Sequence, residues 1–265
     1  MNEIEKITSR DNQRLVMARK IRDGKVTERI FIEGRRLAVE ALRSDISIDE
    51  CFVAEGFKDV DLILGVAKRT SAIYEIPARI FKSIADTDQP QGIILIAQRP
   101  RTGADAIKSR TGVARLPVIA FLKEVNNPSN LGAIMRTAEA AGVSGAIVST
   151  RSADVYSPKA LRAAMGSSFR LPIWENADFD EVLKWAKEGN LVTTAADVSA
   201  SKNYTQIDWK SSRLLIFGSE AHGLNDDELS KIDELIKIPM ESNVESLNLA
   251  VSAGIMLFEA KRQNS

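Results

Sequence analysis

The stretch IKIPMESNVESLNLAVSAGIMLFEAKRQNS, residues 236–265, decides the fold of this chain. It begins with a short apolar run that ends at Pro239 and Met240, and it continues as a polar loop. Beyond the loop, apolar residues recur at the spacing of one helix face. The residues that would share this buried face are Leu247, Val251, Gly254, Leu257 and Phe258. A strand therefore leads into a polar loop and then a buried helix, an arrangement that presents backbone N–H groups and small polar side chains to a ligand.

Ser246 and Asn248 lie at the junction between this loop and this helix. Both side chains are common helix caps, and for either residue alone capping is the favoured interpretation. Both also lie where a ligand at the strand end would meet them. Helix capping and ligand contact are compatible roles for these residues. Two stretches upstream in the sequence favour ligand contact.

The composition excludes several classes of protein. The 265 residues carry 36 basic and 36 acidic side chains, so no overall field draws the chain to nucleic acid. The single cysteine, Cys51, excludes a disulfide framework or a thiolate metal cluster, and the single histidine, His222, excludes a histidine-rich metal site. The first residues lack an apolar signal core, and no run approaches membrane-spanning length. We expect a soluble, cytoplasmic protein without a metal.

Residues 1–100 alternate strand and helix patterns, which predicts a small α/β domain. Eleven Lys and Arg against seven acids fall within residues 1–44. For any single arginine a solvated helix face is the favoured interpretation, whereas the cluster as a whole could hold RNA phosphates. The RNA-binding candidates are Arg14, Arg19, Arg22, Arg35 and Arg36. Residues 101–115 are polar, basic and rich in small side chains, and they predict a linker to a second domain at 116–265.

The second domain opens with the buried strand LPVIAFLKEV and the segment NNPSNLGAIMRTAEAAGVSGAIVS. Pro128 fixes a turn, Asn130 is the predicted helix start and Gly142 the predicted helix end. Arg136 points away from the inward apolar stripe of this helix. The stripe consists of Leu131, Ile134, Ala138 and Ala141. Strand, helix and strand form one βαβ unit, so the sheet is expected to be parallel and functional at the carboxyl ends of its strands.

A further apolar strand, in LLIFGSEAHGLND, stops at Gly218 and is followed by a turn that holds Glu220 and His222. His222 is lone and lies beside a glycine, which favours an exposed turn residue over a catalytic base. Glu220 taken alone is best interpreted as a solvated acid. No G-x-G-x-x-G turn follows any strand, which argues against a nucleotide-binding dehydrogenase.

Three of these stretches together resemble a known family. NPSNLGAIMRTAEAAG, LLIFGSEAHGL and IPMESNVESLNLAVSAGIMLFEA are similar, in order and spacing, to the three motifs of the SpoU–TrmH (SPOUT class) RNA ribose 2′-O-methyltransferases. The amino-terminal ITSRDNQ, FIEGRR and PQGIILI are similar to the RNA-substrate-binding domain often fused ahead of that catalytic domain. The first motif departs from the family in carrying Asn127 where an acidic residue is frequent.

The resemblance implies a small α/β amino-terminal domain followed by a mostly parallel-sheet SPOUT domain with a carboxyl-terminal trefoil knot. It also implies a homodimer that binds S-adenosylmethionine in the knotted loops. On this resemblance the cofactor-binding positions are Thr194, Gly218, Ile238, Met240 and Leu247. The active-site positions are Asn130, Arg136, Glu220, Ser246 and Asn248.

Methyl transfer to a ribose hydroxyl is an in-line displacement in which the hydroxyl must lose its proton near the transition state. The pKa of an arginine exceeds about 12 in water, so Arg136 is expected to hold the phosphate, fix the ribose and stabilise developing charge. A role for Arg136 as the proton acceptor, which is often proposed for the family, stays open. The resemblance implies that this arginine serves RNA bound mainly to the other subunit.

The sequence thus predicts transfer of a methyl group from S-adenosylmethionine to a ribose 2′-hydroxyl of 23S-type ribosomal RNA. Ribosomal RNA is favoured over transfer RNA because the fused front domain is typical of members that modify ribosomal RNA. The alternatives are a transfer RNA 2′-O-methyltransferase, an enzyme that methylates a drug site for antibiotic resistance, and a catalytically silent RNA-binding protein. A silent protein is disfavoured by the intact active-site positions, which are Asn130, Arg136, Glu220 and Asn248.

Overall fold

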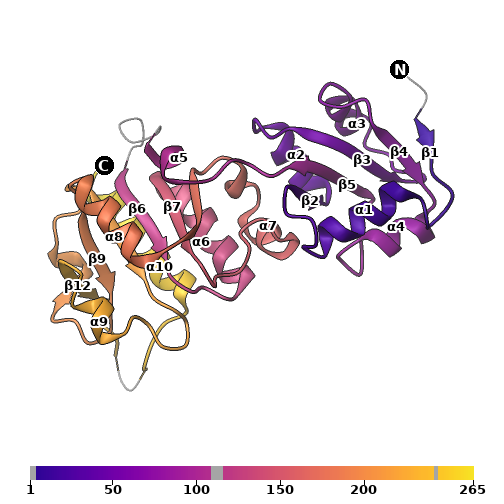
Figure 1. The fold of residues 1–265 in the computed structure, drawn as a ribbon. Helices are drawn as coiled ribbons and strands as arrows, with labels where there is room; N and C mark the ends of the chain where they lie inside the picture. Colours follow the sequence, from indigo (N-terminus) through magenta and orange to yellow (C-terminus); the bar gives the residue numbers. More distant parts are fainter. Residues whose placement is uncertain (1–3, 109–115, 242–243) are drawn as a thin grey trace. The chain divides into compact units, whose positions relative to one another are not determined.

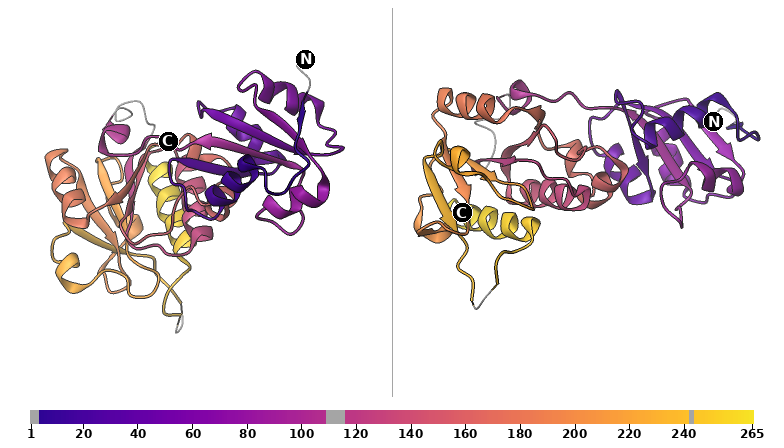
Figure 2. Two further views of the ribbon diagram at one scale, coloured as in Figure 1. Left: turned by 45° about the vertical axis from the view of Figure 1, so that its right-hand side comes forward. Right: turned by 60° about the horizontal axis from the view of Figure 1, so that its bottom comes forward.

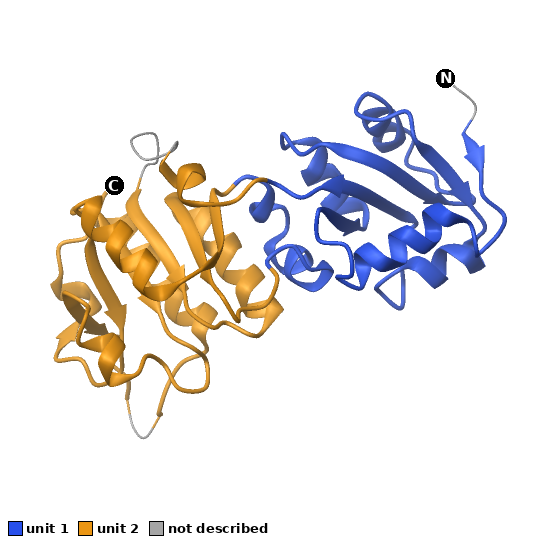
Figure 3. Ribbon diagram, in the orientation of Figure 1, with its two compact units in different colours: residues 1–100, 155–170 blue, residues 101–154, 171–265 orange. Residues whose placement is uncertain are grey.

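The computed structural model describes residues 4–108, 116–241 and 244–265, which form two compact units (Figure 3). The first unit comprises residues 1–100 and 155–170, and the second comprises residues 101–154 and 171–265. Each unit has its own sheet and its own apolar core. No helix among the described residues is both long and apolar enough to span a membrane.

The first unit is built on a five-stranded mixed sheet with the order β1-β4-β3-β5-β2 (Figure 1). Strands β1, β4 and β3 run parallel, and β5 is antiparallel to both β3 and β2. The strand bounds are Glu5–Lys6 (β1), Arg29–Glu33 (β2), Ile48–Ala54 (β3), Ile73–Ile76 (β4) and Ile93–Gln98 (β5). The small amino-terminal α/β domain predicted from the strand and helix patterns is confirmed.

Helices cover both faces of this sheet, as the views in Figures 1 and 2 agree. Buried side chains of α1 and α4, such as Leu15 and Phe81, share one core with Phe31 and Phe52 of the strands. Helices α2 and α3 lie on the opposite face, and α7 also belongs to this unit. The helix bounds are Gln13–Arg22 (α1), Arg35–Leu42 (α2), Val60–Ala67 (α3), Ala78–Ile84 (α4) and Pro158–Ala164 (α7).

The second unit is built on a seven-stranded sheet with the order β10-β12-β9-β11-β6-β7-β8. All neighbouring strands pair in parallel, which confirms the predicted parallel-sheet domain. The strand bounds are Leu116–Leu122 (β6), Val143–Ser149 (β7), Ile173–Ala177 (β8), Val192–Ala196 (β9), Lys202–Asn203 (β10), Arg213–Phe217 (β11) and Glu234–Lys237 (β12).

Helices again cover both faces of the sheet. Helices α5, α8 and α9 pack on one face around a core that includes Ile107, Phe121 and Ile216, and α6 and α10 pack against each other on the other face. The helix bounds are Ala104–Lys108 (α5), Pro128–Ala141 (α6), Phe179–Glu188 (α8), Asp226–Leu229 (α9) and Leu249–Gln263 (α10). Two short 3-10 helices span Ser167–Phe169 and Tyr204–Gln206.

The helix within the first motif, α6, begins at Pro128, earlier than the predicted start at Asn130. Asn127 is the cap residue of α6 and its side chain accepts hydrogen bonds from the backbone N–H groups of Ser129 and Asn130. Pro128 therefore takes the first helical position, where its missing N–H costs no hydrogen bond. The predicted end at Gly142 is confirmed, because this residue adopts φ 91° as the left-handed cap. The predicted inward stripe of α6 is buried as expected.

The predicted buried face of the carboxyl-terminal helix is wrong in part. Leu247 precedes α10, and the side chains of Val251 and Phe258 are 50% and 47% exposed. The residues that α10 buries are Ala253, Met256, Leu257, Glu259 and Ala260. The segment LAVSAGIMLFEA is apolar on nearly every side, so its periodicity does not single out one face.

The structure differs in part from the linker and the domain boundaries expected from the sequence. Residues 109–115 of the predicted linker lie outside the described residues, but residues 104–108 form helix α5, in which Ile107 is fully buried. Residues 155–170, placed by sequence in the second domain, belong to the first compact unit. The division at residue 116 and the trefoil knot stay predictions.

Candidate active site

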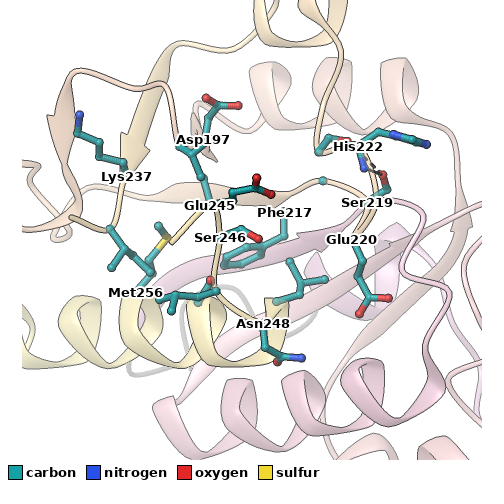
Figure 4. A pocket seen from close by; sticks show the side chains of 18 of the residues that line it. Asp197, Phe217, Ser219, Glu220, His222, Lys237, Glu245, Ser246, Asn248 and Met256 are labelled. Carbon is teal, nitrogen blue, oxygen red and sulfur yellow. Dashed lines mark hydrogen bonds between the residues drawn. The ribbon is translucent and has the colours of Figure 1, made fainter. Parts of the chain in front are cut away.

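A cavity of about 570 Å³ lies at the carboxyl edge of the parallel sheet in the second unit (Figure 4). Its walls come from the ends of three neighbouring strands and the segments that follow them: residues 196–198 at the end of β9, 218–223 after β11, and 238, 240 and 245–249 after β12. Asn130, near the start of α6, adds a wall from the next strand position, after β6. Parallel strands bring such loops to one edge, and this is the edge where α/β sheets bind ligands.

The loop after β11 closes into a tight turn. The backbone N–H of Gly223 donates to the carbonyl oxygen of Ser219 at 2.9 Å, and the reverse bond is 3.1 Å long. A Cβ atom at Gly218 would lie 2.3 Å from the carbonyl carbon of Gly223, so only glycine fits there. Glu220 and His222 are both exposed in this turn, as expected for His222, and both line the cavity.

Three residues from the three sequence motifs meet at the cavity rim. The side-chain amide of Asn248 donates to Asn130 Oδ1 at 3.3 Å, and Asn130 Nδ2 donates to the carboxylate of Glu220. Asn248 also caps α10, because its Oδ1 accepts from the backbone N–H groups of Ala250 and Val251. The predicted dual role of Asn248, as helix cap and as part of a site, therefore has a structural basis. The network joins the β6, β11 and β12 loops into one unit.

The other two predicted active-site residues, Ser246 and Arg136, lie outside this hydrogen-bond network. Ser246 lines the cavity beside Asn248 but is not part of this hydrogen-bond network. Arg136 is exposed on α6 and does not line the cavity. It lies six residues beyond Asn130, which is about 9 Å along a helix axis at 1.5 Å per residue.

Four of the five predicted cofactor positions, Gly218, Ile238, Met240 and Leu247, line the cavity, and Thr194 does not. Thr194 is fully buried in β9, and its hydroxyl accepts a 2.8 Å hydrogen bond from Arg213.

The bond to Arg213 belongs to a buried polar group beneath the site. Arg213 is 4% exposed and its guanidinium also pairs with Glu234 at 2.5 Å. Burial acts to raise the pKa of the Glu234 carboxyl. The hydrogen bonds and charges of Arg213 and Lys202 outweigh this effect and hold that pKa below its usual range. This group ties β9, β11 and β12 together, the three strands whose loops form the cavity.

The segment after β9 reaches the cavity further along the chain than predicted, at residues 196–198. Asp197 is the residue that the sequence reasoning missed. Its carboxylate accepts a 2.8 Å bond from the backbone N–H of Ser199, which turns the chain back after the strand. The available signal was its position as the first acidic residue after the buried strand LVTTAA.

The cavity combines an apolar floor with acidic walls. Phe217, Ile236 and Met256 supply apolar surface, and Asp197 and Glu220 lie around it (Figure 4). Acidic side chains stabilise a cationic ligand, and a cavity of this volume falls within the range of cofactor sites. The residues present therefore fit S-adenosylmethionine, which carries a positive sulfonium, an ammonium group and an apolar adenine face.

The five arginines proposed for RNA binding lie in the first unit, and four of them have partners within the chain. Arg14 pairs with Glu50, Arg35 pairs with Asp59, and a guanidinium N–H of Arg19 donates to the carbonyl of Arg10.

Arg22 pairs with Asp23 and donates to the carbonyl of Ala85 at 3.0 Å, which joins α1 to the end of α4. Arg36 is exposed, and its side chain has no ion pair or hydrogen bond to the described residues. Their expected role in RNA binding therefore has the best geometric support at Arg36.

The fold and the site define a class: a parallel α/β protein with a cofactor-sized cavity at the carboxyl edge of its sheet, fused to a separate α/β unit. The chain belongs to the SpoU rRNA methylase family, whose model matches residues 117–258. The model of the MRM3-like substrate binding domain matches residues 4–95.

Several relatives resemble the chain over nearly its whole length. An uncharacterized tRNA/rRNA methyltransferase of Synechocystis is 30% identical, with 99% of this chain and 95% of the relative covered. The 23S rRNA (guanosine(2553)-2′-O)-methyltransferase RlmP of Bacillus subtilis is 29% identical, with 97% and 100% covered. The crystal structure of an AdoMet-bound rRNA methyltransferase from Sinorhizobium meliloti has a TM-score of 0.84 at 28% identity, with 98% of both chains covered. The protein is an S-adenosylmethionine-dependent RNA 2′-O-methyltransferase.

Proposed function

We propose that the enzyme methylates a ribose 2′-hydroxyl of 23S-type ribosomal RNA in the cytoplasm. The observation that carries this proposal is the network of Asn248, Asn130 and Glu220 at the rim of a cavity that fits S-adenosylmethionine. Two further facts support ribosomal RNA as the substrate. Residues 4–95 match a substrate-binding domain, and RlmP of Bacillus subtilis is by its name a 23S rRNA methyltransferase.

The cofactor supplies an activated methyl group when it is bound. Gly218, Ile238, Met240 and Leu247 would hold it along the loops, and Phe217 and Met256 would exclude water from beneath it. Exclusion of water strengthens every electrostatic interaction inside the cavity.

The network at the rim would orient the substrate ribose. With Glu220 and Asn248 as fixed neighbours, the amide of Asn130 has a defined orientation, which is the preorganisation that a reacting hydroxyl needs. Ser246 lies beside this network, where its hydroxyl can bind a ribose or phosphate oxygen. The chain thus contributes positioning and charge stabilisation to the transfer.

Arg136 would complete the site from the other subunit of a homodimer. Its place on α6, away from the cavity of its own chain, supports this arrangement. Helix α10 packs against α6 and leaves Val251 and Phe258 about half exposed. Between them in sequence is Gly254, where a Cβ atom would lie 3.7 Å from Thr137, the residue after Arg136. An apolar surface beside this arginine is what a dimer interface would cover.

Ribose methylation can be mapped on ribosomal RNA and transfer RNA from cells with and without the gene. We expect one ribose 2′-O-methyl group of the large-subunit RNA to disappear with the gene and to return with the wild-type gene. The Asn130→Ala gene should fail to restore it, whereas Arg43→Gln, an exposed change in the first unit, should restore it. Loss of a transfer RNA modification with the ribosomal RNA pattern intact would contradict the proposed substrate.

A further inference from the structure

A second cavity, of about 460 Å³, lies wholly within the first unit. Three segments form it: the turn from β2 into α2, the loop before β5, and helix α7. The residues that matter for its chemistry are Arg36, Leu37, Asp88, Gln91, Arg162 and Met165.

The walls of this cavity are held in place by a buried carboxylate. Glu33, at the end of β2, is 5% exposed. Its carboxylate accepts a 2.6 Å hydrogen bond from the backbone N–H of Asp86 and another bond from the hydroxyl of Thr87. The loop before β5 is thereby fixed to the strand end.

A second link fixes the same loop to the start of α2. The side-chain oxygen of Gln91 accepts a 2.8 Å bond from the backbone N–H of Arg35. Gly34 has φ 103°, a conformation that favours glycine and turns the strand into the helix. The cavity is therefore preformed, which reduces the ordering cost of binding.

The wall formed by α7 comes from a distant part of the sequence. Arg162 lies beyond the match to the substrate-binding domain at 4–95, yet its guanidinium pairs with Asp86 at 2.6 Å. The end of the same segment is held by Arg170, which pairs with Glu40 at 2.7 Å. A segment that the catalytic family model covers thus forms part of a cavity in the first unit.

The lining suits a flat ligand with both polar and apolar parts. The side chains of Arg36, Asp88 and Gln89 have no hydrogen bond or ion pair to other described residues. Leu37 and Met165 add apolar surface. The carboxylates of Glu33, Asp86 and Asp88 offset the charges of Arg36 and Arg162, which disfavours a bare phosphate. An unpaired nucleobase fits, because proteins bind splayed-out bases by hydrogen bonds to their edges and by stacking on guanidinium planes.

We propose that this cavity receives one unpaired nucleobase of the RNA substrate, and that Arg162 joins Arg36 in holding it. The proposal rests on the proposed function, because it concerns the same substrate. It assigns RNA recognition to a residue outside the matched substrate-binding domain.

The test uses the full chain, a protein-free 23S rRNA transcript and filter binding over a range of salt concentrations. Arg36→Gln and Arg162→Gln should each weaken binding about tenfold, within the range of one base contact. The salt dependence of binding should stay as in the wild type, because a base contact releases no counterion. Arg43→Gln makes the same charge change at a residue outside the cavity, and it should alter binding less than about twofold.

The Asp86→Asn variant separates recognition from folding. It removes the partner of Arg162 and leaves the guanidinium available, so RNA binding should stay equal to wild type or become tighter. If the pair only stabilised the unit, Asp86→Asn and Arg162→Gln would weaken binding alike and lower the melting temperature alike. That outcome would overturn the proposal.

Two other outcomes would also overturn it. Unchanged affinity in both arginine variants would remove the cavity from RNA binding, and a salt slope lowered by about one per arginine would indicate a phosphate contact. Methyl transfer by the wild-type enzyme is measured in parallel. It reports on the proposed function alone, so the failure of one proposal is distinguishable from the failure of the other.

Discussion

Lys123 is a buried cation just beyond β6, next to the loops of the cavity. Its side chain is 11% exposed and pairs with Glu124 at 3.2 Å and with Glu228 at 3.0 Å. Glu228 and Asn225 form a capping box that starts α9 directly after the turn lining the cavity. Burial acts to raise the pKa of Glu124, but Lys123 and Arg151 lower it overall, so this carboxylate stays charged beside the lysine. We therefore expect Lys123 to act as a positioning residue for the turn that carries Glu220.

Replacement of this lysine tests that role. Lys123→Met should lower the free energy of unfolding by roughly 2 kcal/mol, below the usual cost of breaking a buried pair because both carboxylates keep other partners. It should raise the KM for S-adenosylmethionine about tenfold and change kcat little at saturation. Lys123→Arg should restore most of the affinity. Lys231→Met removes an exposed pair with Asp180 from the other end of the α9 segment and should resemble wild type; an equal effect of the two methionine variants would contradict the role.

Residue by residue, three of the predicted active-site residues meet in one polar network, and four of the five predicted cofactor positions line the cavity. Asn130, Glu220 and Asn248 lie in three motifs whose strands end at one sheet edge, so their meeting could be expected. Thr194 does not line the cavity, because it lies inside its strand with its hydroxyl bonded to the buried Arg213, a tertiary contact that sequence does not show. The ion pairs of Arg14 and Arg35 could not be predicted from sequence, because their carboxylate partners, Glu50 and Asp59, lie far away in the chain.

At the scale of elements, helix α10 shows where sequence periodicity fails. Its apolar residues surround the helix, and tertiary packing against α6 determines which of them are buried. Val251 and Phe258 are left exposed on the helix that Asn248 caps. The same two helices thus carry Asn130 and Asn248 of the polar network, the proposed dimer surface and Arg136.

The trans arrangement predicts complementation between two inactive proteins. Arg136→Ala and Asn248→Ala should each lose methyl transfer by about 100-fold or more, the scale of removing one charge-stabilising group. After the two proteins are mixed and allowed to exchange subunits, one site in each mixed dimer carries both lesions and the other carries neither. Activity should then return to a fraction of wild type. No recovery after exchange, verified by mass spectrometry of the intact dimers, would place both residues in one subunit.

At the scale of the whole molecule, the two compact units do not follow the order of the chain, because the first unit includes residues 155–170. The strand and helix patterns sufficed to predict two α/β parts with one parallel sheet. They could not show that residues 155–170 belong to the first unit, because the ion pairs Arg162–Asp86 and Arg170–Glu40 join residues far apart in sequence. A periodicity reports burial along one element, and it carries no information about which distant element supplies the partner.

We expect the cavity in the second unit to bind S-adenosylmethionine for methyl transfer to a ribose hydroxyl. The most direct measurement incubates the purified protein with cofactor carrying an isotope-labelled methyl group and unmodified large-subunit RNA. The RNA is then digested to nucleosides for mass spectrometry. We expect labelled methyl on the ribose of one nucleoside with the wild-type enzyme, and a yield at least about 100-fold lower with Asn130→Ala. Label on a base would contradict this expectation. So would RNA that stays unlabelled although the protein is folded and binds the cofactor.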